Sequence, residues 1–125
     1  MAKSVLIVDD NAYIRQALCR VFQCESDFEV CGEAVNGRDA IAKAQDLHPD
    51  LIVLDLSMPV MNGFDASREL RQLMPAVPLM MYSAFEDRLV EQQARLVGIS
   101  ELVSKSQPAA ILVSKARSLL YRTAA

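Results

Sequence analysis

The sequence predicts an α/β protein whose core is one sheet of five parallel strands, with helices on both faces. Five short apolar segments alternate along the chain with five stretches in which apolar residues recur every three or four positions. This alternation is typical of parallel sheets, because two parallel strands need a crossover connection that usually contains a helix. The strand segments are mostly apolar throughout, as expected of strands buried on both faces. With 125 residues, the chain is expected to form one domain, residues 1–125.

The first half of the chain is expected to begin with two strands and two helices. A β-branched apolar run predicts a strand at residues 4–8, and Asn11 can cap the helix that follows. The inner stripe of that helix should contain Ile14, Ala17, Leu18, Val21 and Phe22. Residues 28–35 suit a looser, more polar strand at an edge of the sheet. After the turn at Asn36-Gly37, a second helix should direct four residues toward the core: Ala40, Ile41, Ala44 and Leu47.

The third strand is expected at residues 51–55, an unbroken apolar run that ends in Asp55. A short apolar run between turn signals is typical of a strand buried on both faces. Such a strand cannot hold an acid in its middle, but it can hold one at its C-terminal tip. The turn signals after it are Ser57, Pro59, Asn62 and Gly63. The next helix should bury Phe64, Ala66, Leu70 and Leu73.

The last two strands are shorter. The fourth is expected at residues 77–82 and is followed by a helix from about residue 86 to residue 97, with Gly98 as its C-cap. The fifth is expected at residues 99–103, and Pro108 fits the first turn of the final helix. The inner stripe of that helix should contain Ile111, Leu112, Ala116 and Leu119.

Composition argues against several classes of function. The net charge of −3 argues against direct binding of nucleic acid. The chain has no apolar run of about eighteen residues and no signal-peptide pattern, so we expect a cytoplasmic protein without membrane contact. Its cysteines have no metal-ligand spacing and are expected to be reduced and mostly buried: Cys19, Cys24 and Cys31. Basic residues expected on solvated helix faces are Arg68, Arg71, Lys115, Arg117 and Arg122.

Polar side chains follow the ends of four predicted strands. They are Asp9 and Asp10 after the first strand, Asp55 at the third, Ser83 at the fourth and Lys105 near the fifth. Because the carboxyl ends of parallel strands meet at one edge of a sheet, these five side chains should converge. Hydrophobic periodicity does not require polar residues there, so their placement indicates a functional site.

The chemistry of these residue types suggests phosphoryl transfer. Three carboxylates held together repel one another, and a divalent cation relieves the repulsion. All-oxygen ligands suit Mg²⁺, which commonly takes one or two carboxylates together with phosphate oxygens. Asp55 can then act as a nucleophile that forms an aspartyl phosphate. Lys105 offers a compact positive charge and Ser83 a hydroxyl donor for phosphoryl oxygens.

At these positions the chain resembles a response-regulator receiver domain, the phospho-acceptor part of two-component signalling. The resemblance covers nearly the whole chain and rests on Val8-Asp9-Asp10, Pro49-Asp50-Leu51, Leu54-Asp55, Met58-Pro59-Val60-Met61-Asn62-Gly63, Ser83-Ala84, and Lys105 seven residues after Gly98. The stretch from Leu102 to Ser106 is faintly similar to the NarL/FixJ group, whose members carry a DNA-binding domain. The family implies a doubly wound, flavodoxin-like sheet of strand order 2-1-3-4-5.

The resemblance also implies roles. Asp55 would be the phosphorylation site, and Ser83 and Lys105 would hold phosphoryl oxygens. The Mg²⁺ ligands would be Asp10, Asp55 and the backbone carbonyl of Ser57, with Asp9 acting mostly through water. The phosphoryl donor would be a sensor histidine kinase or a phosphotransfer protein, and the domain would assist its own phosphorylation and dephosphorylation without being an enzyme. The output surface would be the fourth helix, fifth strand and fifth helix, through which a homodimer could form.

The chain departs from the family pattern at three positions. Leu102 stands where the family usually has a Tyr or Phe whose rotamer follows the Ser/Thr of the site, here Ser83, and Tyr82 should face the opposite side of the sheet. Ser106 replaces the proline that often follows the lysine, so a cis peptide bond there is not expected. Phe85 lies two residues after Ser83, and we hypothesise that it shields an aspartyl phosphate from water.

The sequence bears on four candidate functions. A phosphorylation switch, acting on transcription through an output domain or a partner, fits the sequence best. A receiver-like docking or dimerisation module remains the alternative because of Leu102. A phosphatase of the haloacid dehalogenase type would need a second Asp where Ser57 stands. A flavin or nucleotide binder would need a phosphate-binding loop, and the acidic Asp9-Asp10 would repel a phosphate.

Overall fold

The protein is described by a computed structural model that covers residues 2–84 and 88–121. Strands and helices alternate along the chain, as the sequence predicts. The strands are β1 (Lys3–Val8), β2 (Phe28–Ala34), β3 (Leu51–Asp55), β4 (Leu79–Ser83) and β5 (Glu101–Ser104). The helices are α1 (Ala12–Gln23), α2 (Gly37–Leu47), α3 (Gly63–Leu73), α4 (Arg88–Leu96) and α5 (Ala109–Leu120). None of the helices described is long and apolar enough to cross a membrane.

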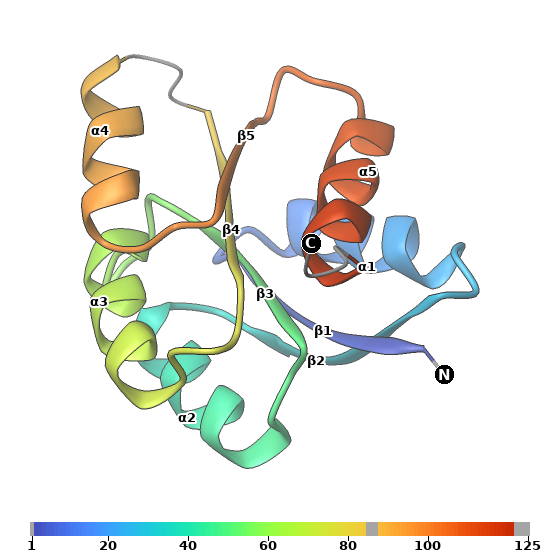
Figure 1. Ribbon diagram of the computed structural model, residues 1–125, viewed down its shortest axis with the longest axis horizontal. Helices are drawn as coiled ribbons and strands as arrows, with labels where there is room; N and C mark the ends of the chain where they lie inside the picture. The colour runs from blue at the N-terminus through green and yellow to red at the C-terminus, as the bar shows by residue number, and fades with distance from the viewer. Residues whose placement is uncertain (1, 85–87, 122–125) are drawn as a thin grey trace.

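The strands form one parallel sheet in the order β2-β1-β3-β4-β5, which confirms the expected doubly wound fold. Helices α2, α3 and α4 lie on one side of the sheet, and α1 and α5 lie on the other (Figure 1). Strand β3 is at the centre, and all five of its residues are buried. Its unbroken apolar sequence is therefore explained by burial on both faces.

Two hydrophobic clusters form the core, one on each face of the sheet. The cluster under α2, α3 and α4 includes Leu6, Ile52, Leu54, Leu70 and Met81. The cluster under α1 and α5 includes Ile7, Phe22, Val53, Met80 and Leu112. Alternate residues of β3 thus belong to opposite clusters, because successive side chains of a strand point to opposite faces.

Asparagine side chains fix the starts of three helices close behind the strand tips. Asn11, Asn36 and Asn62 each accept a hydrogen bond from the backbone N–H three residues later. Each such cap is worth about 1 kcal/mol. Helix α5 differs, because Pro108 precedes it and makes no side-chain cap.

Strands β4 and β5 begin two residues later than expected. Pro78 has no N–H to donate to the ladder, so β4 begins directly after it. Ile99 belongs to the end of α4, because its N–H donates to the carbonyl of Ala94 at 2.9 Å. With Gly98 at φ 88°, this bond forms the C-terminal cap that the sequence predicts. The inner stripes are also shorter than expected, and the exposed members are Ala17, Leu47 and Leu73.

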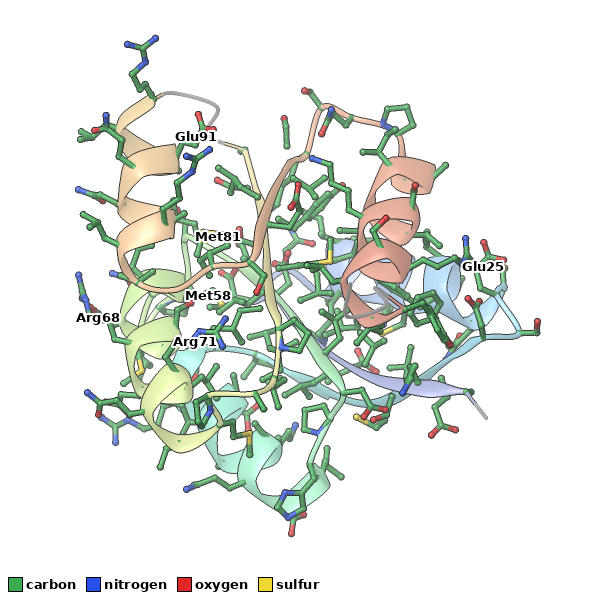
Figure 2. All side chains as sticks on the ribbon, viewed as in Figure 1. Glu25, Met58, Arg68, Arg71, Met81 and Glu91 are labelled. Carbon is green, nitrogen blue, oxygen red and sulfur yellow. The ribbon has the colours of Figure 1, made fainter. Side chains whose placement is uncertain are left out.

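Two arginines that were expected on solvated helix faces make contacts with distant residues. Arg71 is half-buried, contrary to that expectation, whereas Arg117 is exposed as expected but is paired with an acid. Arg71 of α3 donates to the carbonyl of Gly98 at 2.6 and 3.0 Å and also to the carbonyls of Pro75 and Val77. Figure 2 shows Arg71 on the inner side of α3, whereas Arg68 of the same helix projects outward. Arg117 of α5 binds both carboxylate oxygens of Asp27, at 2.7 and 3.0 Å.

The end of α5 is further tied to the turn before β2. The hydroxyl of Tyr121 donates to the carbonyl of Asp27 at 3.1 Å. The C-terminal end of α5 is therefore anchored, while its start lacks a side-chain cap. The expectation of mostly buried cysteines is met in part: Cys19 is buried, Cys31 is half-buried and Cys24 is exposed. Burial raises the pKa of the Cys19 thiol to about 11, so it stays protonated at neutral pH.

Candidate functional site

The C-terminal tip of β3 carries Asp55, which is only 6% exposed. Its strand lies between β1 and β4, so the ends of those strands flank it on both sides. The chain behind Asp55 is held close, because the N–H of Gly63 donates to the carbonyl of Leu56 at 2.8 Å. A larger residue than glycine would strain the chain at position 63, since a Cβ there would clash with the backbone carbonyl of Asp55.

Two further acids come from the loop after β1. Asp9 is 1% exposed, whereas Asp10 is exposed. One carboxylate oxygen from each of Asp9, Asp10 and Asp55 lies within 4.8 Å of the others. Arg15 of α1 donates to the carbonyl of Asp9 at 2.9 Å and so fixes the tip of β1. The expected convergence of three carboxylates is thus present in the fold.

The two carboxylate oxygens of Asp9 differ in their hydrogen bonding. The N–H of Asn11 donates to Oδ1 at 2.9 Å. Oδ2 is buried and accepts no hydrogen bond from the described residues. Burial raises the pKa of the Asp9 carboxyl above its usual range; the neighbouring Asp55 carboxylate adds to the rise, and the Asn11 N–H opposes it. A carboxylate in this setting gains from any cation that reaches it.

Lys105 brings a positive charge to the acids. Its Nζ lies 3.1 Å from Oδ1 of Asp55 and 3.6 Å from Oδ2 of Asp9. The backbone N–H of Lys105 donates to the carbonyl of Ser83 at 2.8 Å, which joins the ends of β4 and β5. Ser83 is 1% exposed at the tip of β4. All five residues expected at the site therefore lie at one edge of the sheet.

An open cleft of about 450 Å³ adjoins the acids on the β3–α3 side. It is lined by Asp10, Leu56, Ser57, Met58, Pro59 and Asn62. Beside it, Val60 has φ 69°, and the Met61 N–H donates to the carbonyl of Pro59 at 2.7 Å. A β-branched residue in this conformation is strained, and such strain often occurs beside functional sites. The Gly37 N–H donates to the carbonyl of Met61 at 3.0 Å and holds the loop against α2.

Sequence reasoning missed two contacts of the site. The role of Arg15 had no signal beyond a basic residue six positions after Asp9. The second is Tyr82, whose ring centroid lies 5.7 Å from Nζ of Lys105. Leu102 packs against the α4 side of the sheet and Tyr82 against the α5 side, as the alternation of side chains predicts. Phe85, which we expected to shield the site, lies outside the described residues.

Comparison with known proteins gives a consistent result. The response regulator receiver domain model matches residues 5–117. The chemotaxis protein CheY of Thermotoga maritima is 36% identical over 113 residues, which cover 90% of this chain and 93% of that protein. The protein-glutamate methylesterase/protein-glutamine glutaminase of Pseudoalteromonas translucida is 43% identical over 84 residues, which cover 67% of this chain and only 21% of that protein.

A solved structure shows the same arrangement of strands and helices. The two-component response regulator of the LuxR family from Aurantimonas sp. SI85-9A1 superposes with a TM-score of 0.92 at 26% identity. The match covers 96% of this chain and 86% of that one. The similar proteins thus include a chemotaxis protein, a longer enzyme and a LuxR-type regulator.

Proposed function

The chain belongs to the family of response regulator receiver domains, and we propose that it is a switch in which Asp55 accepts a phosphoryl group. The family model covers residues 5–117, so the resemblance expected from the sequence is confirmed. One observation carries the proposal: Nζ of Lys105 lies 3.1 Å from a nearly buried Asp55 carboxylate, beside two further acids. These are the parts that phosphoryl transfer needs, namely a nucleophile and charges that stabilise the transferred group.

The acidic residues fit a magnesium ion. Three carboxylate oxygens lie within 4.8 Å of one another, and the buried Oδ2 of Asp9 has no hydrogen-bond donor among the described residues. Carboxylates with an adjoining backbone carbonyl form the all-oxygen donor set that Mg²⁺ prefers. Asp10, Asp55 and the carbonyl of Ser57 would bind it directly, with Asp9 close by. When bound, Mg²⁺ would neutralise negative charge on the phosphoryl oxygens.

The transfer itself needs little movement of the protein. A carboxylate oxygen of Asp55 attacks the phosphorus of a phosphohistidine, the phosphorus–nitrogen bond breaks, and the electron pair stays on the imidazole of the donor. Lys105 already faces Oδ1 of Asp55 and would bind a phosphoryl oxygen after a short shift. Ser83 would donate its hydroxyl to another. Hydrolysis later returns Asp55 to its carboxylate and releases inorganic phosphate.

The partner that this chemistry requires is a phosphohistidine on a sensor histidine kinase or on a phosphotransfer protein. We propose a cytoplasmic location. The domain assists its own phosphorylation and dephosphorylation but turns over no separate substrate. We propose no direct contact with nucleic acid or with a membrane, because the net charge is −3.

The proposed output has two parts, the surface that responds to phosphorylation and the process that this surface controls. Phosphorylation adds about −1.5 to −2 charge at Asp55. This added charge would act on the surface formed by α4, β5 and α5, where a partner or a second copy of the chain could bind. The similarity to a LuxR-family regulator supports an output in transcription, whereas the CheY relative supports a chemotaxis output. The much longer methylesterase relatives would instead support an output through an attached enzyme.

A docking module without a phosphate-dependent output is the second candidate. One observation favours it: Leu102, half-buried against the α4 side of the sheet, offers no aromatic ring that could change its position with the state of Asp55. In that case the acids would persist as a structural cluster, and partner binding would be independent of phosphorylation.

Intact-mass measurement separates the two candidates. The protein is incubated with Mg²⁺ and acetyl phosphate, and the Asp55→Asn variant serves as the matched control. The switch predicts one added phosphoryl group in the wild-type protein and none in the variant. It also predicts that removal of Mg²⁺ by a chelator abolishes the adduct. The absence of an adduct from the wild-type protein would overturn the switch and favour the docking module.

A further inference from the structure

Tyr82 is the side chain that links Lys105 to the side of the sheet covered by α1 and α5. It lies in β4, beside Asp55 of β3 in the register of the parallel ladder. Its half-buried ring packs against the cluster that contains Phe22 and Leu112. Nζ of Lys105 lies 5.7 Å from the ring centroid, within the range of a cation–π contact. The ring thus contacts both the site and the core under α5.

Lys105 has three attractive partners at once. Its Nζ contacts Asp55 at 3.1 Å and Asp9 at 3.6 Å, while the Tyr82 ring lies on a third side. The lysine side chain is 20% exposed, so the ring and the acids together limit its movement. The Lys105 side chain has four flexible carbons, and a rigid ring beside it reduces the number of orientations that it can adopt.

Phosphorylation of Asp55 must change the attractions that act on Lys105. A phosphoryl group on Asp55 adds about −1.5 to −2 charge and extends the negative charge beyond the carboxylate. Lys105 would follow the phosphoryl oxygens, and its position over the Tyr82 ring would change with it. The chain has no aromatic ring at Leu102, so the α4 side of the sheet lacks such a contact at that position. The ring that responds directly to the lysine lies on the opposite side.

We infer that Tyr82 is a positioning residue that holds Lys105 at Asp55 and transmits the phosphorylation state of Asp55 toward the α1 and α5 side of the sheet. The inference rests on the proposed function, since it presupposes phosphorylation of Asp55. The side chain, rather than the hydroxyl, is the part required, because the cation contacts the face of the ring.

Substitutions at Tyr82 test the positioning role. Tyr82→Phe keeps the ring, whereas Tyr82→Leu keeps an apolar side chain without a ring. We expect Tyr82→Leu to slow phosphorylation by acetyl phosphate about two- to five-fold, the size of one partly exposed cation–π contact, and Tyr82→Phe to restore the wild-type rate. Tyr121→Leu removes a similar contact with Lys3 far from the site and should leave the rate unchanged. Equal rates for Tyr82→Leu and the wild-type protein would overturn the inference.

Tyrosine fluorescence tests the transmission. The chain has no tryptophan and three tyrosines, so the double variant Tyr13→Phe/Tyr121→Phe leaves Tyr82 as its one fluorophore. We expect its emission to change on phosphorylation and to recover as the phosphoryl group hydrolyses, with no change after Asp55→Asn. Intact mass is recorded in parallel. An unphosphorylated wild-type protein would mean that the proposed function fails, whereas phosphorylation without a change in Tyr82 emission would overturn this inference alone.

Discussion

Replacing Gly63 by alanine should damage both the stability of the domain and the chemistry at Asp55. A Cβ at this position would clash with the carbonyl of Asp55 and would lie 2.9 Å from Cα of Leu56 and 3.1 Å from Cε of Met81. Two of these neighbours are backbone atoms, which cannot rotate away. Restoring an ordinary separation from the carbonyl of Asp55 requires the tip of β3 to retreat by about one ångström.

The expected change in the free energy of unfolding follows from two opposing effects. Overpacking of this kind costs about 1–3 kcal/mol, and the better helix propensity of alanine at the start of α3 recovers up to about 1 kcal/mol. We therefore expect Gly63→Ala to lower the free energy of unfolding by about 1–2 kcal/mol. The displaced Asp55 should also be phosphorylated at least about tenfold more slowly, because a misplacement of about 1 Å can cost a hundredfold.

Gly32→Ala is the matched control. Its Cβ would lie 2.6 Å from Cδ1 of Leu47, but that methyl group ends a side chain in a residue that is 38% exposed and can rotate away. Its effect on stability should remain within about 0.5 kcal/mol, with no change in phosphorylation rate. Urea denaturation followed by circular dichroism measures the first quantity, and intact mass against time measures the second. If Gly63→Ala behaves like Gly32→Ala in both assays, the reasoning about the strand tip is wrong.

Three further predictions concern charged residues. The pKa of Asp9 is raised in the folded protein, so its carboxylate opposes folding above that pKa and the penalty disappears as pH falls through it. Asp9→Asn should therefore raise the melting temperature in EDTA at neutral pH, and this gain should shrink at acidic pH. The variant should also gain less stability from Mg²⁺ than the wild-type protein does. An equal gain in melting temperature at all pH values would contradict this reasoning. Lys105→Met should slow phosphorylation by acetyl phosphate at least about tenfold, because no other described cation lies within 4 Å of Asp55; an unchanged rate by intact mass would refute its role. Arg71→Met should cost about 2 kcal/mol in urea denaturation, because it leaves the carbonyl of Gly98 without its charged donor. Arg68→Met removes only an exposed pair and should cost under about 1 kcal/mol, and equal costs would show that the partly buried bonds of Arg71 are unimportant.

The site could be predicted from the sequence because its geometry depends on topology alone. Asp9, Asp55 and Ser83 are each placed by the end of a strand, and parallel strands share the edge at which they end. Neither the register nor the rotamers had to be known. The same holds for the helix starts at Asn11 and Asn36, where the cap depends only on residues three positions apart.

The contacts that could not be predicted join residues far apart in the sequence. Arg71 and Gly98 are 27 residues apart, and Arg117 and Asp27 are 90 apart, so no local pattern distinguishes these arginines from solvated ones. The contact of Lys105 with Tyr82 depends on the path of a flexible side chain. The start of β5 was misjudged because Ile99 is apolar but completes the cap of α4.

The unequal anchoring of α5 has a mechanical consequence. Arg117 and Tyr121 fasten its far end to the turn at Asp27, whereas its near end, next to the loop of Lys105, has no side-chain cap. The helix can therefore behave as a lever with its fulcrum at Arg117. From Ala109 to Arg117 the helix rises by eight residue steps, about 12 Å, so a push of about 1 Å at the near end tilts the helix by about 5°. Breaking the Arg117–Asp27 pair would weaken this anchor and leave the Tyr121 bond to hold the far end, so the same push would shift more of the helix sideways.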